Sequence, residues 1–160
     1  IDEIFPYITE KLKTEHNFDL EFEIIGSNIP QILEKKVNNS KLNITYHGYV
    51  SDLKNILSKA KISVAPLRYG AGLKGKIVTS LENGLPVIGS DIAFEGININ
   101  KISSKLNFIV GNREEYYSSV YKLIVDENEW KKISVSSIDF VNEHYSIESN
   151  KEKIKEIIYL

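Results

Sequence analysis

The sequence predicts an α/β fold: a Rossmann-like parallel sheet with helices on both faces, in three layers. Short apolar segments typical of buried strands alternate along the chain with longer segments of helical periodicity. Parallel strands need crossover connections, which are usually helical, so this alternation favours a parallel sheet. The chain has 160 residues, of which 42% are hydrophobic, and we expect a single domain over 1–160.

Five short strands are expected. The first begins with alternating residues and ends at a Gly-Ser-Asn cluster, and the later ones are apolar runs bounded by turn-forming or polar residues. In order they are Leu20 to Gly26, Ile44 to His47, Ile62 to Ala65, Val87 to Ile88 and Asn107 to Val110. Ligands of such sheets gather at the carboxyl ends of the strands, so the loops after the first four strands are expected to share one rim.

The helices between these strands carry recognisable start and stop signals. Pro30 suits the first turn of a short helix, and Ser51 or Asp52 is expected to cap the next one. A further helix is expected from Lys76 to Asn83, with Gly84 ending it.

The two ends of the chain are predicted to be helical. Apolar residues recur at helical spacing from Ile1 to Leu12, and again through C-terminal helices at about 114–160. Residue 1 is isoleucine and the chain contains no methionine. We therefore expect a fragment of a longer polypeptide, in which an N-terminal domain and the first strand of the sheet are missing.

The composition argues against several classes of function. With 20 basic and 22 acidic side chains the net charge is −2, which gives no general attraction to nucleic acid. The absence of cysteine removes disulfides and thiolate metal sites and agrees with a cytoplasmic setting. No apolar run approaches the roughly 20 residues that span a bilayer. The three histidines lack metal-ligand spacing, so no metal site is expected.

A glycine-rich basic segment after the third strand is the best candidate for a binding site. In PLRYGAGLKGKI (Pro66 to Ile77) the glycines allow close backbone approach, and Arg68, Lys74 and Lys76 supply positive charge beside the start of a helix. This arrangement suits a phosphate or a diphosphate. The segment matches neither the Walker nor the GxGxxG pattern, so a tight turn with solvated lysines remains the alternative.

This segment and its surroundings resemble the C-terminal, donor-binding domain of GT-B glycosyltransferases of the "glycosyl transferases group 1" type. The match is densest over PLRYGAGLKGKI and NGLPVIGSDIAFEGI. Weaker matches keep the same order: IFPYI, FEIIGS, HGYVSDLKNIL and HYSIES. The resemblance implies the nucleotide-sugar-binding half of an enzyme that transfers a sugar from a nucleotide-sugar to an acceptor in polysaccharide or glycolipid synthesis.

The resemblance also implies how such an enzyme works and where. The transfer would be metal-independent and retaining, with the nucleotide-sugar as substrate and no cofactor. The isolated domain would be inactive, because the acceptor is held mainly by the missing N-terminal domain of the same chain. The location would be cytoplasmic, with peripheral contact at the inner face of the membrane only through the full-length protein.

Roles for individual residues follow from the same resemblance, although it assigns no catalytic residue. Thr79 would face the ribose, and Glu95 is a candidate contact for the sugar. The donor diphosphate would lie against Gly70, Ala71, Gly72, Leu73, Lys74 and Lys76. The segment bordering the nucleobase would be Gly48, Tyr49 and Val50.

The chain departs from the family pattern at an acidic pair. Many relatives carry Glu-x7-Glu across this loop and helix, and these positions fall at Ala71 and Thr79. A carboxylate can accept two hydrogen bonds from a ribose diol, whereas a threonine hydroxyl has one oxygen. Two alternatives therefore stay open: a catalytically eroded GT-B-like domain that acts as a binding or scaffold module, and a sugar-nucleotide epimerase of the same architecture.

Overall fold

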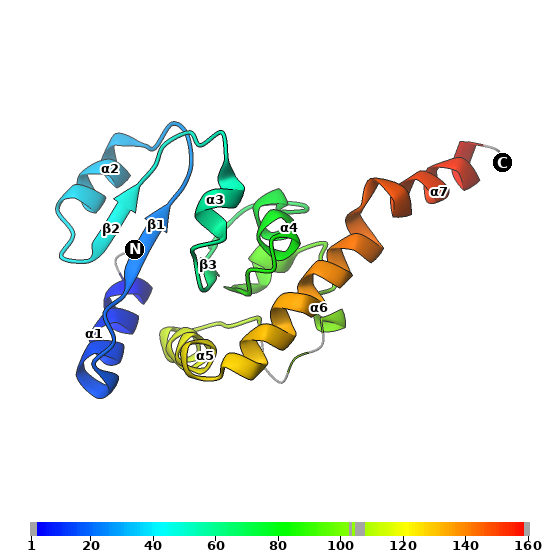
Figure 1. Ribbon diagram of the computed structural model, residues 1–160. Helices are drawn as coiled ribbons and strands as arrows, with labels where there is room; N and C mark the ends of the chain where they lie inside the picture. Colours follow the sequence, from blue (N-terminus) through cyan, green and yellow to red (C-terminus); the bar gives the residue numbers. More distant parts are fainter. Residues whose placement is uncertain (1–2, 103, 105–107, 159–160) are drawn as a thin grey trace. The chain divides into compact units, whose positions relative to one another are not determined.

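The computed structural model describes residues 3–102, 104 and 108–158. It confirms the predicted α/β class, since helices alternate with short parallel strands along the chain (Figure 1). The chain divides into two compact units, Ile1–Asn55 and Ile56–Leu160. Each unit contains a two-stranded parallel sheet.

The first unit is built from two helices and two strands. These are α1 (Ile4–His16), β1 (Glu21–Ile24), α2 (Gln31–Asn38) and β2 (Asn43–Tyr46). β1 pairs with β2 in parallel, from Glu21 opposite Asn43 to Ile24 opposite Tyr46. The ring of Phe5 stacks on Phe22 with centroids 4.9 Å apart, which packs α1 against β1.

The predicted boundaries of the strands and helices in the first unit are correct within a few residues. Pro30 stands immediately before α2 instead of in its first turn, because its carbonyl accepts hydrogen bonds from Leu33 N (2.8 Å) and Glu34 N (3.0 Å). Of the two candidate caps for α3 (Leu53–Leu57), the side chain of Asp52 accepts a hydrogen bond from Asn55 N at 3.2 Å. α3 spans the boundary between the two units.

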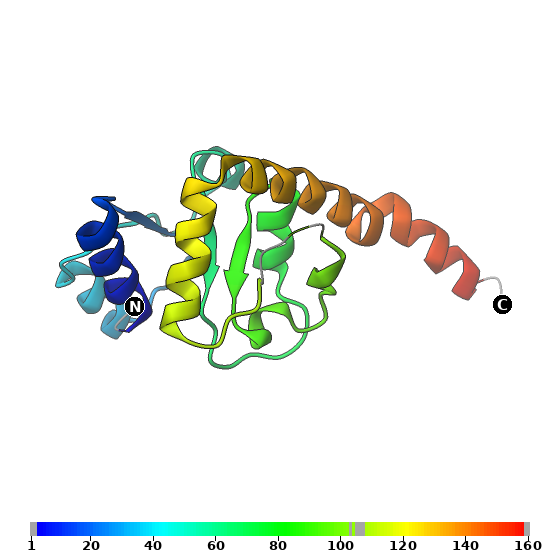
Figure 2. The ribbon, with the colours of Figure 1, turned by 90° about the horizontal axis from the view of Figure 1, so that it is seen from below.

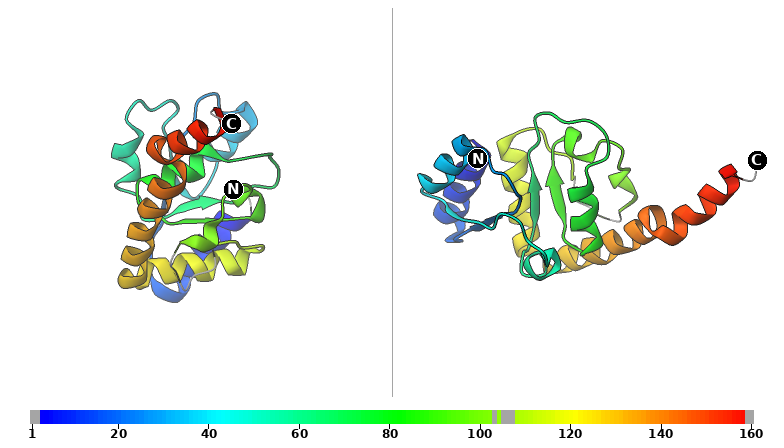
Figure 3. Two further views of the ribbon diagram at one scale, coloured as in Figure 1. Left: turned by 90° about the vertical axis from the view of Figure 1, so that its right-hand side faces the viewer. Right: turned by 90° about the horizontal axis from the view of Figure 1, so that it is seen from above.

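The second unit holds most of the buried core. Its elements are β3 (Ser63–Ala65), α4 (Gly75–Glu82), β4 (Val87–Gly89), two 3-10 helices (Asp91–Phe94 and Ile99–Lys101), α5 (Arg113–Val125), α6 (Glu127–Tyr145) and α7 (Ile147–Ile158). Figures 2 and 3 show α4 and α5 on opposite faces of the β3–β4 sheet. Val87 and Ile88 of β4 are completely buried, as are Ile77 and Leu81 of α4.

The fifth expected strand is not formed as predicted. Of Asn107 to Val110, Asn107 lies outside the described residues, and the rest contributes a single parallel bridge between Ile109 and Gly89. Two backbone hydrogen bonds flank it, from Gly89 N to Phe108 O (3.0 Å) and from Val110 N to Gly89 O (2.9 Å). This segment therefore lies beside β4 without continuing as a regular strand.

In the second unit, α6 packs along the edge of the sheet at which β3 and β4 begin (Figure 2). The indole of Trp130 donates to Lys61 O (2.7 Å), and the Lys61 ammonium lies 4.8 Å from the centre of the same ring. Gly84, just before β4, has a φ of +67° and packs against α6. No helix of the described part of the chain is long and apolar enough to cross a membrane.

We expect Gly84→Ala to destabilise the protein. A Cβ at this position would lie 2.6 Å from Ser134 Oγ and 3.1 Å from Ile138 Cδ1. The left-handed backbone alone costs a non-glycine residue about 1–2 kcal/mol. Urea unfolding measures the loss. Gly26→Ala is the control, since a Cβ there meets no atom within 4 Å; equal midpoints for the two variants would contradict the expectation.

Replacing Tyr116 with phenylalanine should change the pH dependence of stability. Its hydroxyl is buried without a partner among the described residues, and burial raises the pKa of Tyr116 to about 12. The folded state favours the neutral phenol. The contribution of Tyr116 to the free energy of unfolding is therefore fully present below pH 10 and is lost as the pH rises from 10 toward 12.

The Tyr116→Phe variant should lose less stability than the parent across that window, by at most about 1.4 kcal/mol per pH unit. Urea unfolding at pH 8 and pH 11 measures the difference. Tyr69→Phe controls for the loss of one phenol, because the Tyr69 side chain is 88% exposed. Parallel pH dependences for Tyr116→Phe and the parent would overturn this expectation.

Candidate functional site

The glycine-rich segment forms the connection between β3 and α4. Its first residues are tied to the end of the neighbouring strand β4, since Ser90 Oγ donates to Leu67 O at 2.6 Å and Ser90 N donates to Ala65 O at 3.2 Å. Parallel pairing of β3 with β4 brings their carboxyl ends to one edge of the sheet. The loop after β3 and the turn after β4 therefore leave the sheet together, as the sequence predicted for this pair of loops.

Glycine is required at two positions of the loop. Gly70 has a φ of +141° and Gly72 a φ of +68°, which are conformations that other residues adopt at a cost. Gly70 also faces a close neighbour, because a Cβ there would lie 3.1 Å from Lys74 Cε. The residues from Gly70 to Leu73 are all exposed, and Leu73 is 50% exposed.

Lys74 connects the loop to the turn that follows β4. Its ammonium donates to Gly72 O (2.5 Å) and to the carboxylate of Glu95 (3.1 Å). The side chain of Lys74 is only 11% exposed, whereas that of Glu95 is 52% exposed. The structure thus brings together two predicted site residues that are 21 positions apart in the chain.

The start of α4 differs in charge from the starts of α5 and α6. Lys74 is its N-cap residue and makes no side-chain capping bond, and the first turn contains Lys76 but no acidic residue. α5 and α6, by contrast, have Asn112 and Asp126 as capping side chains and two acidic residues each in their first turns. The positive end of the helix dipole and the Lys76 charge therefore add at one point, which favours an anion there.

Thr79 lies one turn after Lys76 on α4 and is half-buried. The helix is held against β3 by Ser80, whose hydroxyl donates to Lys76 O (3.0 Å) and lies within hydrogen-bond distance of the Ser63 hydroxyl (3.3 Å). Ala71 is exposed in the loop. Ala71 and Thr79, the positions at which the resemblance implies an acidic pair, carry no carboxylate, so ribose binding would need other groups.

The residues expected to border a base belong to the first unit. Gly48 has a φ of +61° and its carbonyl accepts a hydrogen bond from Gly26 N at 3.0 Å, so the loops after β1 and β2 meet. The side chain of Tyr49 is 81% exposed, and Val50 is half-buried. His47 is hydrogen-bonded to Glu23.

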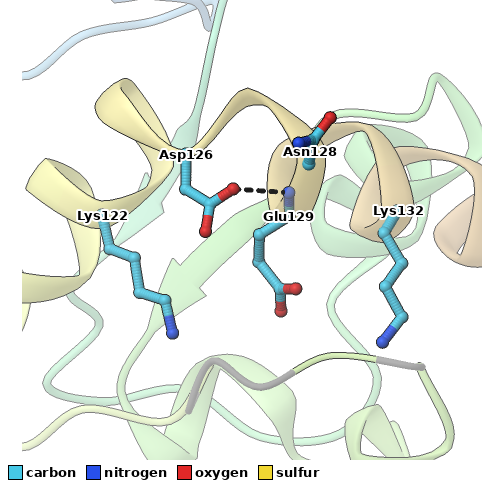
Figure 4. A pocket seen from close by; sticks show the side chains of 5 residues that line it. All are labelled: Lys122, Asp126, Asn128, Glu129 and Lys132. Atoms are coloured by element: carbon cyan, nitrogen blue, oxygen red, sulfur yellow. Dashed lines mark hydrogen bonds between the residues drawn. The ribbon is translucent and has the colours of Figure 1, made fainter.

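A separate hollow of about 400 Å³ lies where α5 meets α6 (Figure 4). Lys122, Asp126, Asn128, Glu129 and Lys132 line it. Asp126 accepts a hydrogen bond from Glu129 N (2.9 Å), and Glu129 accepts one from Ser104 Oγ (2.9 Å), so both carboxylates have structural partners. None of the predicted site residues lines this hollow.

The described residues contain no group of three or more histidine, cysteine, aspartate or glutamate side chains that could hold a metal ion. The feature that sequence reasoning missed is the contact between Lys74 and Glu95. No local pattern could have found it, because the two residues belong to different loops and meet only through the pairing of β3 with β4.

Comparison with known proteins gives one family and several similar structures. The sequence model of a family described as "Glycosyl transferases group 1" matches residues 1–126. No curated protein sequence matches the chain.

The similar structures include two bacterial proteins. A mutant of S. aureus TarM, crystallised with fondaparinux, alpha-GlcNAc-glycerol and UDP, has a TM-score of 0.73 and 19% identity over 96% of this chain and 31% of TarM. The pneumococcal O-GlcNAc transferase GtfA, crystallised with UDP and GlcNAc, has a TM-score of 0.71 and 18% identity over 97% of this chain and 32% of GtfA. The chain therefore spans about a third of the length of these similar structures.

Proposed function

Because the chain belongs to the glycosyl transferases group 1 family and has the fold of one half of a GT-B enzyme, we propose that it is a donor-binding half. In this proposal the whole protein transfers a sugar from a nucleotide-sugar to an acceptor held by an N-terminal domain, in polysaccharide or glycolipid synthesis. The observation that carries the proposal is the start of α4, where glycine backbone and the helix dipole meet Lys76 in a first turn that contains no acidic residue.

The donor diphosphate is proposed to lie against the glycine-rich segment between β3 and α4, which we call the phosphate loop. The first amides of a helix have no acceptor within the helix, so those of Gly75 and Lys76 are suited to phosphate oxygens. The residues from Gly70 to Leu73 are exposed, and the two glycines have no side chain, so an anion can approach the backbone closely. Negative charge grows on the departing nucleoside diphosphate as the glycosidic bond breaks, and positive groups fixed in place stabilise it there. We propose that this transfer is metal-independent and that it retains the anomeric configuration.

The nucleoside is assigned to the other predicted residues. In the proposal Gly48, Tyr49 and Val50 border the base and Thr79 faces the ribose. UDP is the first nucleotide to test, because TarM and GtfA were both crystallised with it. The cytoplasmic location stays a prediction from the sequence.

A second candidate function rests on the missing acidic pair. Ala71 and Thr79 stand where relatives have glutamates, which favours a domain that binds a nucleotide-sugar or a partner without catalysing transfer. Both candidates use the same phosphate loop, and they differ in whether the ribose is held well enough for turnover.

Calorimetric titration of the purified protein with UDP tests the binding site. We expect binding at or below millimolar UDP, and Lys76→Gln should weaken it about tenfold, as expected for the loss of a charge-assisted contact. Lys151→Gln on the exposed surface of α7 is the matched control and should leave the affinity unchanged. An absence of binding for UDP and for the other nucleoside diphosphates at millimolar concentration would sink the proposal.

Thr79→Glu separates the two candidate functions. If another group already holds the ribose of a working donor site, we expect the glutamate to raise UDP affinity by no more than about twofold. A gain of about tenfold would favour the eroded module, because the new carboxylate would then supply a missing bidentate contact. Thr79→Gln controls for side-chain size without the charge, and the same titration measures all three proteins.

A further inference from the structure

The ammonium group of Lys74 is already engaged within the protein. It donates to Gly72 O at 2.5 Å and to Glu95 Oε2 at 3.1 Å, and its side chain is 11% exposed. Its aliphatic stem lies close to Gly70, as the 3.1 Å approach of Lys74 Cε to a Cβ built there shows. Lys74 therefore holds the loop backbone, while Lys76 is exposed and makes no ion pair within the described part of the chain.

The turn that carries Glu95 is itself well anchored. Phe94 is 3% exposed and Ala93 is completely buried. The hydroxyl of Tyr145, at the end of α6, donates to Gly96 O at 3.2 Å. Burial raises the pKa of Tyr145. A Cβ on Gly96 would lie 3.8 Å from Leu73 Cα, so the turn runs near the loop.

We infer that Glu95 is a positioning residue for the phosphate loop: its carboxylate holds Lys74, and Lys74 holds the backbone of Gly70 to Gly72 in the conformation that receives the diphosphate. This inference rests on the proposed function and deepens it. It replaces the direct sugar contact expected for Glu95 with a role exerted through Lys74. In this arrangement Lys76 and the loop and helix amides face the anion.

The charge balance of the site supports this division of roles. A carboxylate beside a diphosphate would repel it, but an ion pair with Lys74 offsets most of that repulsion. A loop that is already held in its binding conformation also loses less conformational entropy when the ligand binds. Removal of Glu95 should therefore weaken diphosphate binding even though it removes a negative charge. A model based on charge alone predicts the opposite sign.

Titration of UDP and uridine into the full chain tests the inference. Glu95→Ala should weaken UDP binding about fivefold and leave uridine binding unchanged, because only the phosphates use the loop. Lys74→Met should weaken UDP binding to a similar extent, and the double variant should be no weaker than Lys74→Met alone. Glu95→Gln, which keeps an acceptor for Lys74, should lie between the parent and Glu95→Ala. Asp139→Ala, at an exposed carboxylate of α6, is the control.

Three outcomes would overturn the inference. Tighter UDP binding by Glu95→Ala would mean that Glu95 competes with phosphate for Lys74. Unchanged UDP binding would leave Glu95 as a sugar contact or as a residue without a role. Additive effects of the two substitutions would mean that Glu95 does not act through Lys74.

Hydrogen exchange distinguishes failure of this inference from failure of the proposed function. Without ligand, the amides of 70–76 should exchange about fivefold faster in Glu95→Ala than in the parent or in Asp139→Ala. If the parent binds no nucleoside diphosphate but exchange still rises, the positioning pair stands and the proposed function fails. If exchange is unchanged, the positioning role is wrong whatever the protein binds.

Discussion

Parallel pairing of β3 with β4 is the constraint on which the candidate site depends. Strands that run in the same direction deliver their following loops to the same edge of the sheet, and the ladder from Ser63 opposite Val87 to Ala65 opposite Gly89 sets how far apart they emerge. Ser90, just after β4, is hydrogen-bonded to both Ala65 and Leu67, so the end of β4 holds the start of the phosphate loop. The meeting of Lys74 with Glu95 follows from this pairing.

α4 combines a structural face with an anion-binding end. Ile77 and Leu81 are completely buried, and Ser80 bonds to β3, so the helix is held in place by packing. Its first turn, in contrast, is poorly suited to helix stability, because it has lysines where acidic residues and caps are favoured. A helix whose packing is strong can tolerate such a start. A bound anion would offset the unfavourable electrostatics, which couples ligand binding to the stability of the loop.

α6 connects regions of the second unit that are distant in the sequence. Three residues of α6 make these contacts. Trp130 donates a hydrogen bond to Lys61, which precedes β3, and Ser134 packs against Gly84, which precedes β4. Tyr145 donates a hydrogen bond to Gly96 in the turn after β4. α6 thus supports two regions: the starts of β3 and β4, and the turn that contacts the phosphate loop. Such a rigid frame allows a loop with two left-handed glycines to keep one conformation.

The sequence by itself determined the alternation of strands and helices, the glycine loop and the family, because these depend on local periodicity, turn residues and the order of short motifs. The alternation at Glu21 to Ile24 and the turn at Gly84 are signals of this kind. Only the tertiary structure decided that Lys74 is held by Glu95, that Ile109 adds a single bridge to β4, and that the buried hydroxyl of Tyr116 finds no partner among the described residues. Each of these depends on which distant segments the fold brings together, and no local sequence pattern contains that information.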